Sequence, residues 1–232
     1  NMLRYLINYA LIVFLSLSII YAQDTGMDKV KEISLKAKKE FAPDKRTSIF
    51  NIDVELSNNI IVLKGETNIK KAKNFILEEL NKLQIDYKDE IALLPSQMLG
   101  TKKYGVINLS VANLRVNPDH AAEMATQSLL GTAVKVFNKK NGWYQIQTPD
   151  GYIGWDDQDG VYLMDKEEVN KWISSSKVIY TNEFSFVYSK ADKKSRRVSD
   201  IVLGSLLKFL GEENGFIKVE YPNGRIGYIE KE

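Results

Sequence analysis

The second half of the chain repeats itself at a constant offset. Gly204 follows Gly131 by 73 residues, and Asn214-Gly215 follows Asn141-Gly142 by the same step. Turn residues and the apolar alternation between them agree in this one register, without a gap, which indicates a duplication. This part of the chain is therefore predicted to consist of two copies of one small folding unit.

Each copy is predicted to consist of short antiparallel strands. In the first, "AVKVFNKKNGWYQIQTPDGYIGWDD" alternates apolar and polar residues and turns at Asn141-Gly142 and Asp150-Gly151, which are strong hairpin signals. About 55 to 60 residues of such strands suit a small barrel, because closure of a sheet removes its exposed edges. We predict barrels over residues 104–163 and 176–232.

A short helix is predicted between the two copies, over residues 164–175. Asp165 and Glu168 form a capping-box pattern, and Trp172 and Ile173 fall on one apolar face with their neighbours. A buried tryptophan in this connection would hold the two barrels at a fixed angle.

Residues 25–95 combine helical and strand patterns. Apolar residues recur at helical spacing through "VKEISLKAKKEF", alternation with polar residues begins at Phe50, and "IIVLKG" follows as a partner strand. A helix over "KKAKNFILEEL", expected to be capped by Thr67, and a strand "EIALL" complete the block. This order fits a small α+β domain whose sheet is covered on one side by two helices, with residues 96–103 as a linker.

The first residues carry the features of a secretory signal peptide. Arg4 precedes the apolar run "ALIVFLSLSII", and Ala22 supplies a small residue at a cleavage point. The run of about 11 residues is shorter than the roughly 20 that a membrane-spanning helix needs, so an anchor is the less favoured alternative. We predict a signal peptide over residues 1–22 and a protein secreted to the periplasm or cell envelope.

Composition narrows the possible functions. The 32 Lys and Arg residues nearly balance 30 Asp and Glu, so a net charge of +2 supplies no large field for nucleic acid. The chain has no cysteine, which excludes disulfides and a cysteine nucleophile, and its single histidine is His120. Asp156, Asp157 and Asp159 lack the pattern of a calcium loop, so we expect exposed turn acids, no metal and no cofactor.

Two parts of the chain resemble known families. "IIVLKGETNIKKAKNFILEEL" resembles the BON family of small bacterial envelope domains, in which a strand ending in Leu-x-Gly precedes an Ala-bearing helix. "GVINLSVANLRVNPDHAAEMATQSLLGTAVKVFNKKNGWYQIQTPDGYIGWDD" closely resembles the first bacterial-type SH3 domain of NlpC-type cell-wall peptidases, and residues 178–232 resemble their second, more divergent SH3 domain. The resemblance implies a BON-like α+β domain followed by two small all-β SH3-like barrels.

The same resemblance implies a function. In these peptidases a papain-like domain follows the SH3 pair and uses a cysteine and a histidine to cleave the γ-D-glutamyl to diamino-acid bond of peptidoglycan stem peptides. This chain stops at the second SH3 copy and has no cysteine, so it is not expected to be an enzyme by itself. The implied function is non-catalytic recognition and positioning of stem peptides, as the front part of a γ-D-glutamyl-L-diamino acid endopeptidase. Its implied partners are the missing peptidase domain and stem peptides with a free N-terminal L-alanine.

The resemblance also assigns candidate ligand-binding residues. In the relatives a carboxylate and a tyrosine of the first SH3 domain close the substrate cleft around the free amine, and Glu123 and Tyr152 match these positions. A carboxylate accepts charge-assisted hydrogen bonds from an ammonium, and a tyrosine can wall off the alanine methyl group. The offset of 73 places Arg196 opposite Glu123 and Arg225 opposite Tyr152, so the second copy should lack this site.

Arg115 and His120 are further candidates, each with a plainer alternative. Arg115 ends the "NLR" strand and either contacts the ligand or braces the strand. His120 lies in the "NPDH" turn and either contacts the ligand or is a solvated loop residue. Trp143 and Trp155 are expected in the barrel core rather than as platforms for sugars.

An envelope scaffold is the main alternative function. Lysines of the two N-terminal helices could attract anionic lipid headgroups, although solvated helix faces are the favoured interpretation. These lysines are Lys36, Lys38, Lys39, Lys70, Lys71 and Lys73. A groove for proline-rich peptides, as in signalling SH3 domains, is less compatible with secretion and with the family resemblance.

Overall fold

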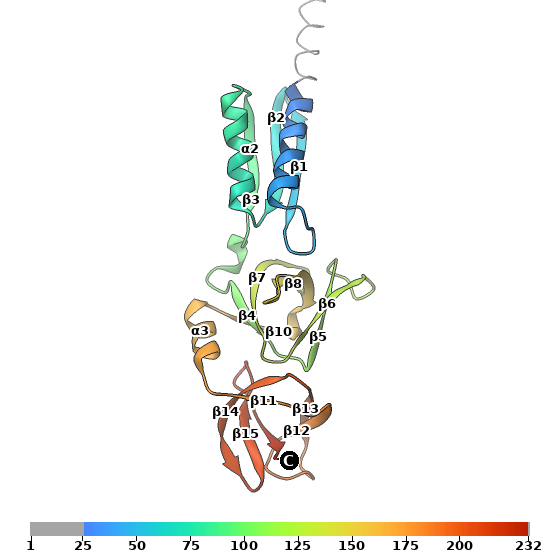
Figure 1. Ribbon diagram of the computed structural model, residues 1–232, viewed down its shortest axis with the longest axis vertical. Helices are drawn as coiled ribbons and strands as arrows, with labels where there is room; N and C mark the ends of the chain where they lie inside the picture. Colours follow the sequence, from blue (N-terminus) through green and yellow to red (C-terminus); the bar gives the residue numbers. More distant parts are fainter. Residues whose placement is uncertain (1–25, 232) are drawn as a thin grey trace, which may run out of the picture. The chain divides into compact units, whose positions relative to one another are not determined.

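The computed structural model describes residues 26–231, which fall into two compact units divided between Leu94 and Pro95 (Figure 1). The predicted signal peptide, residues 1–22, lies outside the described part of the chain. Within that part, no helix is long and apolar enough to cross a membrane.

The first unit is a three-stranded sheet packed against two helices. Its elements are, in order, a helix over residues 26–41, β1 (Phe50–Ser57), β2 (Ile60–Thr67), α2 (Lys70–Lys82) and β3 (Tyr87–Leu93). β1 and β2 form an antiparallel hairpin, whereas β2 and β3 are parallel and therefore need the crossover that α2 provides. This order of elements confirms the predicted α+β arrangement.

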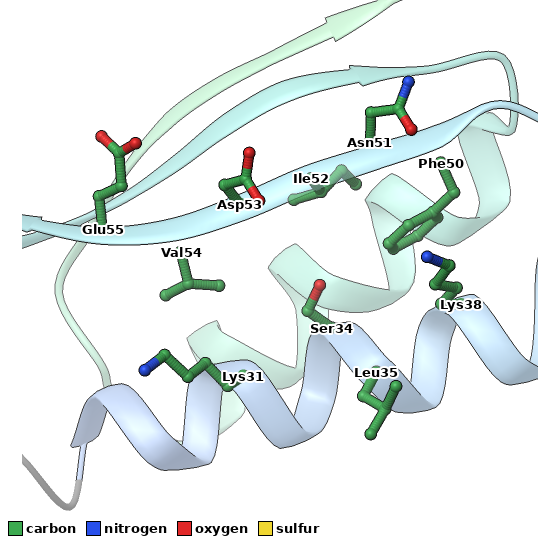
Figure 2. Close-up of a pocket in the computed structure, with 10 residues that line it drawn as sticks. All are labelled: Lys31, Ser34, Leu35, Lys38, Phe50, Asn51, Ile52, Asp53, Val54 and Glu55. Atoms are coloured by element: carbon green, nitrogen blue, oxygen red, sulfur yellow. The ribbon is translucent and has the colours of Figure 1, made fainter.

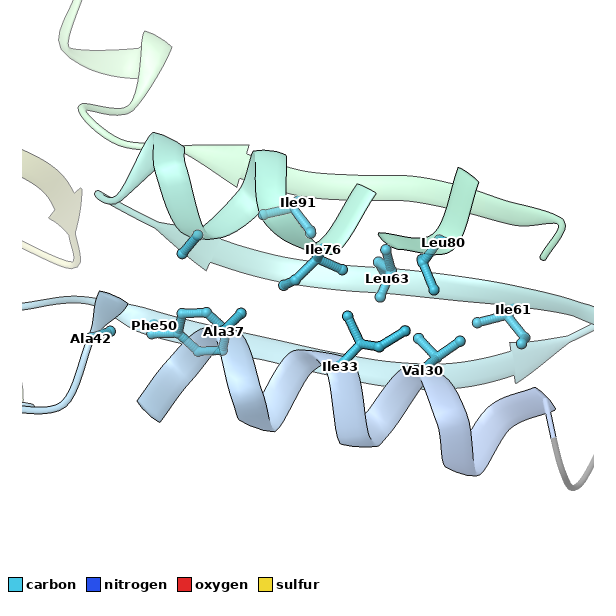
Figure 3. Close-up of a cluster of buried hydrophobic side chains, with 11 residues drawn as sticks. Val30, Ile33, Ala37, Ala42, Phe50, Ile61, Leu63, Ile76, Leu80 and Ile91 are labelled. Carbon is cyan, nitrogen blue, oxygen red and sulfur yellow. The ribbon is translucent and has the colours of Figure 1, made fainter. Parts of the chain in front are cut away.

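One hydrophobic core joins the two helices to the sheet (Figure 3). Val30 and Ile33 of the first helix, Ile76 and Leu80 of α2, and Leu63 of the central strand β2 are all buried in it. Each helix therefore directs one apolar stripe toward the sheet, as the helical spacing of these residues predicts.

Thr67 does not cap α2, contrary to the prediction. It is the fully buried last residue of β2, and its hydroxyl donates to the carbonyl of Ile49 at 2.7 Å. The N-cap position of α2 is Ile69, which makes no side-chain cap. β2 continues beyond the expected end at Gly65 because Thr67 still pairs with Leu93 of β3.

The second unit contains two antiparallel sheets, one for each predicted barrel. The first barrel comprises β4 (Tyr104–Ile107), β5 (Val111–Arg115), β6 (Met124–Leu129), β7 (Ala133–Lys140), β8 (Trp143–Gln147), β9 (Ile153–Asp157) and β10 (Val161–Met164). The second comprises β11 (Lys177–Ile179), β12 (Phe184–Tyr188), β13 (Arg197–Val202), β14 (Leu206–Glu213), β15 (Phe216–Glu220) and β16 (Ile226–Glu230). The two SH3-like, all-β sheets confirm the predicted fold class.

The strand order confirms the duplication. Neighbouring strands follow the order β10-β4-β7-β8-β9-β5-β6 in the first barrel and β11-β14-β15-β16-β12-β13 in the second. Each of the strands β4 to β9 begins 73 residues before its counterpart. The turns repeat as well: Asn141 and Gly142 have φ values of 49° and 82°, and Asn214 and Gly215 have values of 51° and 77°. Two consecutive positive φ angles are typical of the tight hairpin turn that Asn-Gly predicts.

The segment before the first barrel also contributes to its core. Residues 96–103, expected as a linker, contain the short 3-10 helix η1 (Gln97–Leu99), and Leu99 is buried with the apolar residues of the barrel. The amide of Ser96 donates to the carbonyl of Phe137 at 2.8 Å. A second short 3-10 helix, η2 (Gln158–Gly160), follows β9.

The helix α3 (Lys166–Ser174) connects the two barrels. The Asp165 carboxylate accepts hydrogen bonds from first-turn amides at 2.9 Å, and the Glu168 carboxylate accepts one from the Asp165 amide at 2.7 Å, which is the predicted capping box. Trp172 is buried as expected. Ile173 is instead 61% exposed, because the next residue on a helix points about 100° away from its neighbour.

The two barrels are in direct contact. The Leu206 amide donates to the carbonyl of Leu130 at 2.9 Å, and Leu130 itself packs into the core of the second barrel. The Trp172 indole donates to the carbonyl of Gly131 at 3.0 Å. A Cβ at Gly131 would lie only 1.9 Å from the Leu206 carbonyl oxygen, so this contact requires glycine.

Candidate ligand-binding site

One face of the first barrel combines aromatic, polar and charged side chains. Trp143 of β8 pairs with Asp157 of β9, and Trp155 of β9 pairs with Gln145 of β8 and with Arg115 of β5. Directly opposed residues, and every second residue along a strand, share one face of a sheet. These five side chains, which we call the outer face, therefore lie on the side opposite to the barrel core, which corrects the prediction that Trp143 and Trp155 lie in that core.

The loop that follows β5, residues 116–123, is held by hydrogen bonds at its base. The Val116 amide donates to the carbonyl of Glu123 at 2.9 Å. The half-buried Arg115 donates from Nη1 to the carbonyl of Ala122 at 3.1 Å. Arg115 therefore braces this loop, whereas the plainer of its two predicted roles was to brace the strand.

His120 lies at the tip of the loop, against the outer face. Its ring centroid is 4.7 Å from that of Trp143, with an angle of 57° between the rings, and its Nε2 lies 3.7 Å from Oδ2 of Asp157. The His120 side chain is 80% exposed, whereas Trp143 is 8% exposed. The histidine is thus a solvated loop residue that also covers a tryptophan and faces an acid.

Glu123 and Tyr152 lie at the same end of the sheet. Glu123 directly precedes β6 and Tyr152 directly precedes β9, and both strands are antiparallel to β5, which lies between them. Strands that run in one direction begin at the same edge of a sheet. The two residues therefore flank the end of β5, where Arg115 is located.

The Glu123 carboxylate is open to a ligand. Glu123 is exposed, and its side chain makes no hydrogen bond or ion pair with any residue between positions 26 and 231. Tyr152 is half-buried, and its carbonyl accepts hydrogen bonds from the amide and the hydroxyl of Thr148, each at 3.0 Å. An accessible carboxylate and an anchored tyrosine thus border the same edge of the barrel.

Asp156 is buried, so its predicted exposure is wrong. It is 3% exposed, its Oδ2 has no hydrogen-bond partner within the described part, and only the amide of Asp157 hydrogen-bonds the carboxylate. Burial raises the pKa of the Asp156 carboxyl to about 7. A Cβ at Gly160 would lie 2.4 Å from Oδ2, so the missing side chain of this glycine leaves room for the acid. Among residues 26–231, no group of His, Asp and Glu side chains is arranged to hold a metal ion.

Gln145 is a candidate that the sequence analysis missed. It lies on the outer face opposite Trp155, and its Oε1 is buried without a hydrogen-bond partner in the described part of the chain. The alternation in "WYQIQ" places it on the same face as Trp143, which is the signal that could have identified it. An unpaired buried acceptor is suited to receive a hydrogen bond from a ligand or water.

The second barrel keeps this geometry but not its chemistry. Lys193 and Glu230, the counterparts of the histidine and acid described above, form an ion pair at 2.6 Å. Arg196 occupies the position of the open carboxylate in the first barrel. Arg225 stands at the position of the anchored tyrosine, and its guanidinium lies 4.2 Å from the ring centroid of Tyr221.

The first unit contains an open groove of about 730 Å³ between the helix over residues 26–41 and β1 (Figure 2). Lys31 and Lys38 line it from the helix, with Ser34 between them. Asp53 and Glu55 line it from β1 and point away from the helix. The charged side chains of the helix and of the strand thus do not converge on one point of the groove.

Both barrels match families of bacterial SH3 domains. Residues 114–157 match the family described as the bacterial dipeptidyl-peptidase SH3 domain, and residues 184–232 match the family described as the bacterial SH3 domain. Among curated proteins, the putative N-acetylmuramoyl-L-alanine amidase YrvJ of Bacillus subtilis (strain 168) is 24% identical over 137 residues. That match covers 56% of this chain but 26% of the relative, so the chain spans about a quarter of its length.

Solved structures of NlpC/P60 proteins show a limited likeness. An NlpC/P60 family protein from Bacillus cereus ATCC 10987 is 21% identical, with 55% of this chain and 54% of that chain covered and a TM-score of 0.47. An NlpC/P60 endopeptidase from Photobacterium damselae subsp. piscicida is 16% identical, with 70% and 37% covered and a TM-score of 0.40. With the strand order and the two family matches together, the chain carries two bacterial SH3 domains, the first of the dipeptidyl-peptidase type.

Proposed function

We propose that this chain recognises peptidoglycan stem peptides in the cell envelope and positions them for a γ-D-glutamyl-L-diamino acid endopeptidase. The observation that carries the proposal is the exposed, unpaired Glu123 carboxylate at the edge of the first SH3 domain. The match of this domain to the dipeptidyl-peptidase SH3 family supports a cell-wall context. The chain has no cysteine and so supplies no thiolate nucleophile, which leaves recognition as its part in the reaction.

The chemistry at this edge suits a peptide with a free N-terminal amine. An ammonium group would donate charge-assisted hydrogen bonds to Glu123. The ring of Tyr152, at the start of a strand on the other side of β5, would limit the space left for the alanine side chain. From there the peptide would extend over the outer face, toward His120 and the buried acceptor of Gln145.

The lipid-binding alternative receives less support, because two of its six lysines are engaged within the first unit. Lys73 is half-buried, pairs with Asp89 at 2.7 Å and donates to the carbonyl of Ile91 at 2.6 Å. The ammonium of Lys36 lies 5.4 Å from the ring centroid of Phe75. These contacts stabilise the α+β unit and reduce the charge that is available to a membrane surface.

An NMR titration of the chain with L-Ala-γ-D-Glu-diaminopimelate tests the proposal. We expect chemical-shift changes around Glu123 and Tyr152 in the wild type, and their loss in Glu123→Gln, which keeps the size of the side chain but removes its charge. Glu183→Gln is the matched control, because Glu183 is likewise an exposed acid with no side-chain partner within residues 26–231. It should bind the peptide like the wild type.

The N-acetylated peptide distinguishes amine recognition from other contacts. Acetylation removes the positive charge and the ammonium donors, so we expect the shifts around Glu123 to vanish. Equal shifts with the acetylated and free peptides would contradict recognition of the amine. An absence of shifts at saturating free peptide would contradict recognition of stem peptides by this chain.

A further inference from the structure

The two homologous barrels carry loops of opposite charge. In the second barrel, residues 189–196 read "SKADKKSR", with four cations and one acid, and Arg197 follows at the start of β13. The corresponding residues of the first barrel, 116–123, read "VNPDHAAE", with two acids and no lysine or arginine. The balanced charge of the whole chain therefore conceals a concentrated positive surface on one barrel, which we call the basic loop (residues 189–197).

The basic loop is ordered by its own hydrogen bonds. The Ser189 amide donates to the carbonyl of Arg196 at 2.8 Å and closes the base of the loop. The Lys194 amide donates to Oδ1 of Asp192 at 2.9 Å, and the Ser195 amide donates to the Asp192 carbonyl at 3.0 Å. The single acid of the loop is therefore used for backbone structure. A backbone that is already ordered reduces the conformational entropy lost when the loop binds a ligand.

Three cations of the basic loop are available to a ligand. Lys190, Lys194 and Arg196 are exposed, and their side chains have no hydrogen-bond or ion-pair partner in the part of the chain that the structure describes. The other two are engaged: Lys193 pairs with Glu230 at 2.6 Å, and the Arg197 guanidinium lies 3.7 Å from the ring centroid of Phe186. Uncompensated cations on one short loop repel each other, and a multivalent anion would relieve this repulsion.

Aromatic rings extend the surface from the basic loop along β12. Phe184 is 55% exposed, and its ring centroid lies 5.1 Å from that of Phe186, with the rings nearly perpendicular. Tyr188, on the same face of β12, contacts Phe216 edge to face at 6.1 Å. The equivalent strand of the first barrel carries Val111, Asn113 and Arg115 at these positions. The second barrel thus combines free cations with an exposed ring, a surface suited to a polymer that has both anionic groups and apolar segments.

We propose that the basic loop of the second barrel binds a linear polyanion, with Lys190, Lys194 and Arg196 contacting phosphate or carboxylate groups on successive repeats. Phosphate polymers and carboxylate polymers supply the same oxyanion chemistry. Arginine binds such oxyanions with paired hydrogen bonds, and lysine acts as a mobile point charge. This site is separate from the stem-peptide site of the first barrel and does not depend on it. The second barrel would then be an anchor with its own ligand rather than a spacer.

Binding of the full chain to fluorescently labelled inorganic polyphosphate and to labelled polygalacturonate tests this proposal. The decisive variant is Lys190→Gln/Lys194→Gln/Arg196→Gln, and we expect it to weaken binding about tenfold or more at low salt. The matched control is Lys45→Gln/Lys64→Gln/Lys103→Gln, which removes three exposed lysines that lie outside the second barrel. It has the same net charge as the loop variant and should bind within about twofold of the wild type.

Three readouts complete the test. Raising the salt from about 0.01 M to about 0.15 M should weaken wild-type binding strongly, because the screening length falls from about 30 Å to about 8 Å. Tighter binding of one polymer shows whether the loop prefers phosphate or carboxylate groups. Equal binding of both supports recognition of the oxyanion chemistry that they share. Glu123→Gln should leave polyanion binding unchanged.

Two results would overturn the proposal. Equal weakening by the two triple variants would show that net charge, and not the basic loop, attracts the polymer. No binding of either polymer by the wild type at low salt would show that the loop is a solvated surface. None of the three tryptophans lies in the second barrel, so wild-type-like NMR amide resonances of residues 176–232 outside the loop are the measurement that verifies that the loop variant keeps this barrel folded.

Discussion

Asp156 gives the second unit a stability that depends on pH. Burial raises the pKa of its carboxyl from the ordinary 3.8 to about 7. Between these values the folded state holds a proton that the unfolded state has released, so stability falls as the pH rises through this range and stays low above it. Asp156→Asn cannot ionise, and we expect it to be on the order of 3 kcal/mol more stable than the wild type at about pH 8. At about pH 4 the two proteins should differ little.

Urea unfolding followed by tryptophan fluorescence measures this difference, because the three tryptophans report on the second unit. Asp159→Asn is the matched control: Asp159 is an exposed acid of η2, so its removal should change stability equally little at both pH values. A constant difference between Asp156→Asn and wild type across the range would show that Asp156 is already ionised in the folded protein.

At the scale of single residues, the sequence left His120 and Arg115 with two roles each, and the structure shows a solvated loop histidine and an arginine that donates to the carbonyl of Ala122. Contact of either side chain with a ligand stays a prediction. The sequence failed for Asp156, which pairs with the core residue Tyr144 of β8 and therefore faces the barrel core. The carboxylate fits there because Gly160, next to it, has no side chain. Both the strand pairing and this space depend on residues outside β9.

At the scale of elements, the capping box of α3 supports a direct test. Asp165→Ala removes the acceptor for two amides of the first turn, and we expect a loss of about 1 kcal/mol. Glu167→Ala removes an acid of the same turn that pairs only with Lys171, one turn later, so it should cost less than about 0.5 kcal/mol. Urea unfolding measures both variants. Equal losses would show that negative charge near the helix N-terminus, rather than the hydrogen bonds of Asp165, stabilises α3.

Elements with local signals were predicted more reliably than those that depend on partners. The Asn-Gly turns and the capping box of α3 follow from a few adjacent residues, and both are confirmed. Thr67 was predicted as a helix cap from its position before α2, but the parallel pairing of β2 with β3 extends the strand through it. The resemblance of this unit to BON domains stays a prediction.

At the scale of the whole molecule, the repeat offset predicted the equivalence of strands β4 to β9 with β11 to β16. The offset could not predict how the copies contact each other, because it compares each copy only with its equivalent. The contact joins Leu130 and Gly131 of the first barrel to Leu206 of the second. Nor does equivalence of strands imply equivalence of ligands. An open carboxylate at Glu123 and an arginine at the matching position of the second barrel would give the two copies opposite preferences.

The most direct test of this account is one NMR titration in which the stem peptide and then polyphosphate are added to the same sample. We expect the peptide to shift resonances around Glu123 and Tyr152, and polyphosphate to shift those of residues 189–197, with each set unaffected by the other ligand. Two separate sets of shifts would show that duplication produced two different binding sites. Shifts of the same residues by both ligands, or peptide shifts confined to the second barrel, would contradict this account.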